Sequence, residues 1–223
     1  MFIRYYILLL MSVFSLPSFA QTAKEVIGNI NKTYKNAKSI SQNIAYYYYD
    51  SLSAKTYSSS ELGVLKKQGA STYYKVGDVE IIATAALVFQ IDHGTKDAVV
   101  SPFTGGAASQ STGDFSQELD QLLVPCTESS IDKSQGTFHK LTLKCKSSRF
   151  SEIQILYHKD KFYISSMLLI DRSGIKMEIK YSDVKLNTKI APSFFDVSKY
   201  LSGDKKTYKM KEAYNSYELK NSF

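Results

Sequence analysis

Residues 137–182 contain four short runs in which apolar and polar residues alternate: T-F-H-K-L-T-L-K (137–144), S-E-I-Q-I-L-Y-H (151–158), F-Y-I-S-S-M-L-L-I (162–170) and I-K-M-E-I-K-Y (175–181). Successive side chains of a β-strand point to opposite faces of the sheet, so each run predicts a strand with one apolar face. The breaks K-D-K (159–161) and D-R-S-G (171–174) are typical of hairpin turns. The stretch therefore predicts an antiparallel meander with one buried face.

Further strands are expected before this meander, at residues 40–49, 57–65, 70–76, 79–84, 86–92 and 97–101. A twisted sheet of this size tends to curl. We therefore predict an α+β fold, a strongly curved antiparallel sheet of about ten to eleven strands that forms a half-open β-barrel. Residues 21–200 are expected to form this domain, and residues 201–223 a polar C-terminal extension.

Two helices are expected to cover the concave face of the sheet. Residues 22–37 have apolar residues at three- and four-residue spacing, and Thr22 with Glu25 fits a capping box. Residues 114–124 predict a short central helix that Asp114 caps and Pro125 ends. Each helix has one apolar stripe, so each needs an apolar surface to pack on.

The N-terminus has the features of a secretion signal. Arg4 precedes an apolar run at residues 5–14, and S-F-A at 18–20 fits a cleavage site after Ala20. We expect residues 1–20 to be a signal peptide and the protein to be periplasmic. In an oxidising compartment, Cys126 and Cys145 are most simply a disulfide.

The composition argues for a binding protein more than for an enzyme. The formal net charge is +7, spread thinly over many lysines, which suits a solvated surface or an anionic partner. His93, His139 and His158 have no metal-ligand spacing, and no nucleophile accompanies Asp92-His93. We therefore expect no catalytic residues, metal or cofactor, and no nucleic-acid partner.

Three segments resemble the LolA family of periplasmic lipoprotein carriers: D-R-S-G at 171–174, I-K-M-E-I-K-Y-S-D-V-K-L-N at 175–187 and S-F-F at 193–195. The resemblance implies a half-barrel whose apolar cavity binds the acyl chains of lipoproteins or other lipids. It also implies transfer towards the outer membrane, between an inner-membrane donor and an outer-membrane acceptor. We expect a monomer.

Under this hypothesis, particular apolar residues form the lipid site. The expected cavity lining is Leu87, Phe89, Ile91, Ile153, Ile155, Met177 and Ile179, and the expected lid is Phe115, Leu119, Leu122 and Leu123. The same residues also fit a filled hydrophobic core. In that alternative the protein is a non-enzymatic envelope binding or assembly module, which uses its tyrosine-rich strand (residues 46–49) to bind a protein or glycan.

Overall fold

The computed structural model describes residues 22–103, 119, 126–146 and 149–223. The expected signal peptide lies outside the described residues. So does the short central helix except for Leu119, and with it the predicted lid residues Phe115, Leu122 and Leu123.

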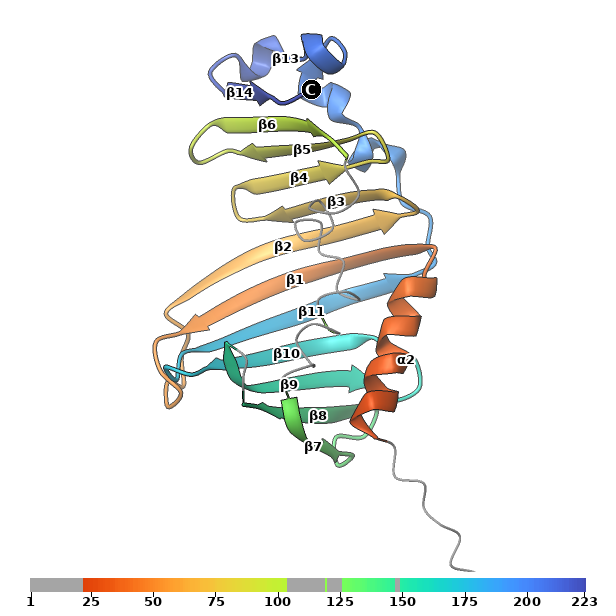
Figure 1. Ribbon diagram of the computed structural model, residues 1–223, viewed down its shortest axis with the longest axis vertical. Helices are drawn as coiled ribbons and strands as arrows, with labels where there is room; N and C mark the ends of the chain where they lie inside the picture. Colours follow the sequence, from red (N-terminus) through yellow and green to blue (C-terminus); the bar gives the residue numbers. More distant parts are fainter. Residues whose placement is uncertain (1–21, 104–118, 120–125, 147–148) are drawn as a thin grey trace, which may run out of the picture.

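A single open sheet dominates the fold (Figure 1). Within the described residues it has twelve strands, slightly more than expected, in the order β14-β6-β5-β4-β3-β2-β1-β11-β10-β9-β8-β7. Their bounds are β1 (Ser39–Tyr49), β2 (Ser59–Gln68), β3 (Ser71–Val76), β4 (Val79–Ala83), β5 (Leu87–Asp92), β6 (Asp97–Pro102), β7 (Cys126–Asp132), β8 (Phe138–Cys145), β9 (Phe150–His158), β10 (Ile164–Asp171), β11 (Lys176–Leu186) and β14 (Glu218–Asn221). Each pair is antiparallel except β14 with β6, and the two end strands β14 and β7 do not pair with each other. The predicted curved antiparallel sheet that does not close into a barrel is therefore confirmed.

Helix α2 (Ala23–Asn36) begins where the capping box predicts. The backbone N–H of Glu25 donates to the Thr22 hydroxyl at 3.2 Å, and its carboxylate accepts from the Thr22 N–H at 2.8 Å. The apolar stripe of the helix, Val26, Ile27, Ile30 and Tyr34, is buried. In Figure 1, α2 crosses β8 to β11 near one end of these strands, so it packs on this part of the sheet.

The strand register shows which residues share the face under α2. Ile179 lies opposite Tyr46 on β1 and opposite Met167 on β10. Met167 in turn lies opposite Ile155, and Ile155 opposite Leu141. Directly opposed residues point to the same side of a sheet. These side chains pack with Ile27 and Ile30 of the helix in one core, and we call this side the α2 face.

A second core lies on the other side of the sheet, which we call the opposite face. Leu65 belongs to the α2 core and lies opposite Tyr74, so the neighbouring Tyr73 points the other way. Tyr73 lies opposite Ile82, which lies opposite Phe89, and all three belong to this second core. The cover is the C-terminal segment, residues 190–223, so this part of the sheet has a core on the face opposite to α2.

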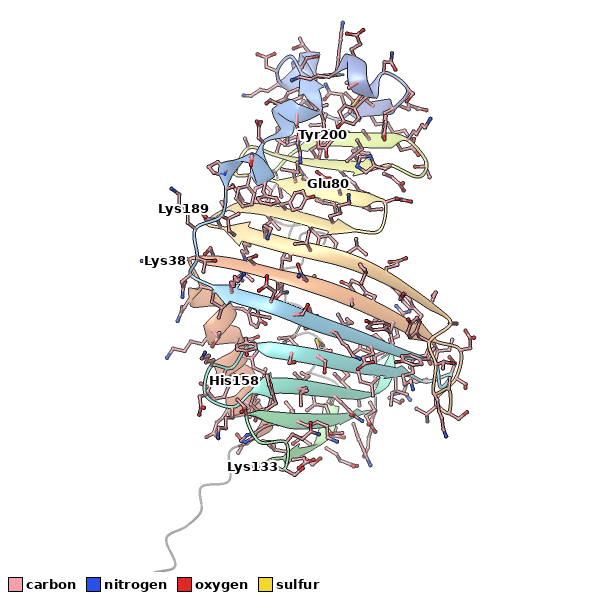
Figure 2. All side chains as sticks on the ribbon, turned by 180° about the vertical axis from the view of Figure 1, so that it is seen from behind. Lys38, Glu80, Lys133, His158, Lys189 and Tyr200 are labelled. Carbon is pink, nitrogen blue, oxygen red and sulfur yellow. A yellow bond between two sulfur atoms is a disulfide. The ribbon has the colours of Figure 1, made fainter. Side chains whose placement is uncertain are left out.

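The C-terminal segment is built from short elements. They are the 3-10 helices η1 (Pro192–Phe195), η2 (Val197–Lys199), η3 (Lys205–Thr207) and η4 (Glu212–Tyr214), the strands β12 (Leu201–Ser202) and β13 (Lys209–Met210), and the edge strand β14. A buried carboxylate anchors this segment: Glu80 accepts hydrogen bonds from the Tyr200 hydroxyl at 2.7 Å and from Lys199 Nζ at 2.9 Å. Figure 2 shows Glu80 and Tyr200 beside each other at this end of the molecule.

Candidate ligand-binding groove

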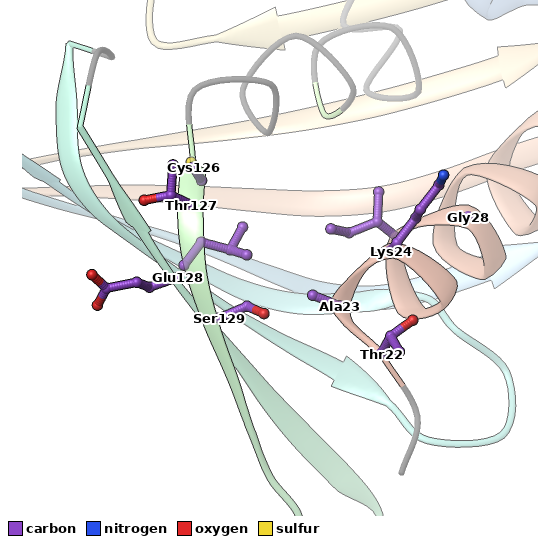
Figure 3. Close-up of a pocket in the computed structure, with 10 residues that line it drawn as sticks. Thr22, Ala23, Lys24, Gly28, Cys126, Thr127, Glu128 and Ser129 are labelled. Atoms are coloured by element: carbon purple, nitrogen blue, oxygen red, sulfur yellow. The ribbon is translucent and has the colours of Figure 1, made fainter. Parts of the chain in front are cut away.

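A groove of about 620 Å³ lies between the first turns of α2 and the start of edge strand β7 (Figure 3). Its volume is in the range typical of small-molecule sites. The described residues that line it are Thr22, Ala23, Lys24, Ile27, Gly28, Cys126, Thr127, Glu128, Ser129 and Leu143.

The apolar surfaces of the groove come from both layers. Ala23 and Ile27 belong to the stripe that α2 turns towards the sheet, and Leu143 of β8 is almost fully buried beneath them. Ser129 lies opposite Leu143 in the strand register, so it shares the α2 face. The groove therefore has aliphatic walls on two sides, and β7 supplies hydroxyl groups along its edge.

The charged side chains at the groove point away from its centre. In Figure 3 the carboxylate of Glu128 is directed away from the helix, and the ammonium group of Lys24 is directed away from β7. Among the described residues, no group of three or more His, Cys, Asp or Glu is placed to hold a metal ion. An aliphatic interior with charges turned outward suits an apolar chain better than a charged ligand.

The predicted disulfide is confirmed, and it forms part of the groove wall. Cys126 pairs with Cys145 directly across β7 and β8, with their Cα atoms 3.8 Å apart. β7 is an edge strand that pairs with β8 alone, and most of its residues are exposed. The disulfide thus fastens this wall of the groove to β8 covalently, in addition to the strand pairing.

The predicted cavity lining does not come together. Ile153, Ile155 and Ile179 are buried in the α2 core, with Met177 packed against it. Leu87, Phe89 and Ile91 belong to the second core instead, on the opposite face under the C-terminal segment. None of the seven is among the described residues that line the groove. A role for them in lipid binding stays a prediction.

Of the predicted lid, Leu119 is the one described member. Its side chain is fully buried in the α2 core. The sequence does not predict the groove, because Thr127 and Ser129 precede the meander in a segment without alternation. The capping box at Thr22 located the start of α2, which is one rim of the groove.

Three buried polar atoms on the α2 face have no hydrogen-bond partner within the described structure. They are Gln42 Oε1 on β1, His139 Nδ1 on β8 and the Tyr157 hydroxyl on β9. His139 and Tyr157 are cross-strand neighbours whose rings meet edge to face. A buried polar group without a partner costs about 1–3 kcal/mol. The α2 core is therefore less stable than its apolar burial alone would make it.

The comparisons with known proteins give likeness of structure alone. No protein-family model matches the chain, and a search of curated proteins gives no significant match. Among solved structures, an uncharacterized conserved protein from Thermus thermophilus is 12% identical, with 78% of this chain and 91% of that chain covered and a TM-score of 0.48. MucB in complex with MucA is 9% identical and has a TM-score of 0.48. The match covers 79% of this chain and 60% of MucB. A LolA superfamily protein from Nitrosomonas europaea is 11% identical and has a TM-score of 0.39. The match covers 81% of this chain and 100% of that protein.

A LolA superfamily protein is thus among the structural neighbours of the chain. TM-scores below 0.5 carry no inference about function. The structure itself shows an open sheet with an N-terminal helix packed on it. None of the helices in the described part of the chain has the length and apolar character needed to cross a membrane.

Proposed function

We propose that the protein is a non-enzymatic carrier of the cell envelope that holds the acyl chains of lipoproteins or other lipids and moves them towards the outer membrane. The observation that carries the proposal is the groove between α2 and β7. It combines a ligand-sized volume with aliphatic surfaces from Ala23, Ile27 and Leu143, and its charged neighbours point outward. Each methylene group moved from water into such a site contributes about 0.8 kcal/mol.

Entry of a long chain would be aided by movement of α2. The α2 face contains Gln42, His139 and Tyr157, whose buried polar atoms have no partner among the described residues, and this weakens the packing on that face. Two polar links hold its C-terminal half: the Tyr34 hydroxyl accepts from the Ile164 N–H, and the Thr33 hydroxyl donates to the Lys161 carbonyl. We expect the N-terminal half, beside the groove, to move more readily.

Export is supported by two features of the chain. Residues 1–20 fit a signal peptide, and the disulfide between Cys126 and Cys145 is of the kind that persists in oxidising compartments. A periplasmic location would place the groove where lipids must cross an aqueous space.

The alternative function is that of an envelope binding or assembly module with a filled core. The complete burial of Ile153 and Ile155 favours it, because these side chains were expected to line an open cavity. In this case the groove would hold no lipid, and the protein would act through its surface.

Two measurements separate these functions. The first is lipid extraction and mass spectrometry of protein purified from the cell envelope. The second is the uptake of a dansyl-labelled fatty acid by the lipid-free protein and by two variants. Ala23→Trp fills the groove, whereas Lys32→Trp places the same ring on the exposed side of α2.

The carrier predicts co-purifying acyl lipids, and uptake that falls at least tenfold in Ala23→Trp and is unchanged in Lys32→Trp. Absence of lipid together with absence of uptake would favour the filled module. Equal uptake by both variants would place the acyl site elsewhere, and this groove would then lose its assigned role.

A further inference from the structure

Large apolar side chains are exposed at one end of the sheet, away from both cores. Leu52, Tyr57 and Ile175 are 56%, 52% and 50% exposed. Leu52 and Tyr57 lie in the loop between β1 and β2, and Ile175 lies in the turn between β10 and β11. We call residues 50–58 and 171–175 the hairpin tip. Single exposed apolar residues are ordinary, but three in two adjoining loops form a patch.

The two loops of the tip are held together. Lys176 Nζ donates to the carbonyl oxygen of Ala54 at 2.9 Å, and it lies 3.9 Å from the ring centre of Tyr49. Tyr57 packs on Tyr47, with ring centres 5.0 Å apart. In Figure 1 both loops project side by side beyond the sheet at the lower left. The tip is therefore one ordered projection of the fold.

The charges and aromatic rings at the tip are arranged as at a membrane interface. The tip contains the cations Lys55 and Arg172, and Lys176 follows it directly. The tip also contains two carboxylates, Asp50 and Asp171. Asp171 is turned into its own loop, where it accepts from the backbone N–H groups of residues 173 and 175. Tyrosine rings and lysines behind exposed aliphatic side chains are typical of segments that lie at the boundary between water and lipid.

We propose that the hairpin tip is a membrane-docking element that inserts Leu52, Tyr57 and Ile175 into the lipid surface. A narrow projection suits insertion into lipid better than a protein interface, which requires a broad complementary surface of about 1,000 Å² or more. The proposal goes beyond acyl binding and does not require it.

Docking by the tip would bring the end of the groove towards the lipid. Arg172 of the tip donates to the carbonyl oxygens of Cys145, at 3.3 Å, and of Lys146. Cys145 is bonded to Cys126, which lines the groove. The tip and the disulfide side of the groove therefore lie at the same end of the sheet. A protein that exchanges lipid with a membrane needs its lipid site close to the part that docks.

The chain contains no tryptophan, so a single introduced tryptophan reports its own environment. We would compare Leu52→Trp with Val99→Trp, which replaces an exposed apolar residue on β6, far from the tip in the strand order. Each protein is mixed with vesicles of phosphatidylethanolamine and phosphatidylglycerol, with and without brominated acyl chains. We expect a blue shift and strong quenching for Leu52→Trp and neither for Val99→Trp.

Sedimentation with the same vesicles measures the contribution of the aliphatic side chains. Leu52→Ser and Ile175→Ser should each lower the partition coefficient about tenfold, whereas Val99→Ser leaves it unchanged. Replacing phosphatidylglycerol by phosphatidylcholine should lower binding a few-fold, because the excess of cations at the tip is small. Equal partitioning of all three serine variants, or an emission spectrum of Leu52→Trp that vesicles do not shift, would overturn the proposal. Dansyl fatty acid uptake by the serine variants should stay normal, so failure of docking is distinguishable from failure of acyl binding.

Discussion

The Tyr34 hydroxyl of helix α2 accepts a hydrogen bond from the backbone N–H of Ile164, at the start of β10, at 3.0 Å. Both residues are buried in the α2 core. The bond satisfies a buried main-chain donor, and it fixes the helix over the sheet. Burial raises the pKa of Tyr34 to about 12, and the bond from Ile164 opposes that rise only in part.

Tyr34→Phe should lower the free energy of unfolding at pH 8 by about 1–2 kcal/mol, because the Ile164 N–H loses its partner. The wild-type protein then has its own pH dependence. The fold favours the neutral phenol of Tyr34. The free energy of unfolding that this preference contributes is therefore fully present below the unfolded pKa of 10.0, and it is lost as the pH rises towards about 12. Two pKa units correspond to about 3 kcal/mol.

Urea unfolding of both proteins between pH 8 and pH 12 measures this effect. All other ionisable groups are the same in both proteins, so the difference in stability between them isolates Tyr34. We expect the wild type to be more stable at pH 8 and the gap to close or reverse above pH 11. A difference that stays constant over this range would mean that Tyr34 does not titrate as a buried phenol.

Glu80 is the polar anchor of the C-terminal segment. Its carboxylate is buried and accepts from Tyr200 and Lys199, so Glu80→Gln should destabilise this segment by about 2 kcal/mol. Hydrogen exchange should show faster exchange in residues 197–221, with α2 unchanged. Tyr200→Phe should have a smaller effect of the same kind. Uniform destabilisation of both halves would show that the two cores unfold as one unit.

The meander was predictable because residues 175–181 alternate strictly and their turns are short. What could not be predicted was the face to which Phe89 points. β5 alternates, but the neighbouring β4 has buried apolar residues on both sides, such as Ile81 and Ile82, so alternation does not identify the covered face. Only the strand register, followed from Leu65 and Tyr74 to β5, shows that the Phe89 side chain points to the face of the sheet away from the α2 core.

The sequence also does not predict that the C-terminal segment covers the second core, for a related reason. The aromatic anchors Phe194, Tyr200 and Tyr214 lie on short 3-10 helices and irregular turns, where no helical or strand period applies. For residues 201–223 the sequence therefore predicts a polar extension, although Tyr214 is one of these anchors. Its burial depends on contacts with β3 to β6, distant in the sequence, and local patterns do not reveal such contacts.

The disulfide should matter to both stability and the groove. Its loop spans 19 residues, so its loss should destabilise the protein by about 3 kcal/mol in the chain-entropy model. We expect the double variant Cys126→Ala, Cys145→Ala to lower the urea midpoint and to weaken dansyl fatty acid uptake, because edge strand β7 then loses its covalent link to β8. Lower stability with unchanged uptake, measured well below the new midpoint, would show that the groove does not need a fixed β7.

Two glycines should respond in opposite ways to the same substitution. A Cβ at Gly63 on β2 would lie 2.4 Å from the Lys75 carbonyl oxygen and 2.5 Å from Val76 Cγ2, whereas a Cβ at Gly28 on α2 meets nothing within 4 Å. Gly63→Ala should cost about 1–3 kcal/mol, because β3 must shift away. Gly28→Ala should stabilise the protein by about 0.5–1 kcal/mol through helix propensity. Thermal and urea unfolding measure both changes. A destabilising Gly28→Ala would indicate that the groove side of α2 approaches another part of the chain closely, and a neutral Gly63→Ala would mean that β2 and β3 are loosely packed at this pair.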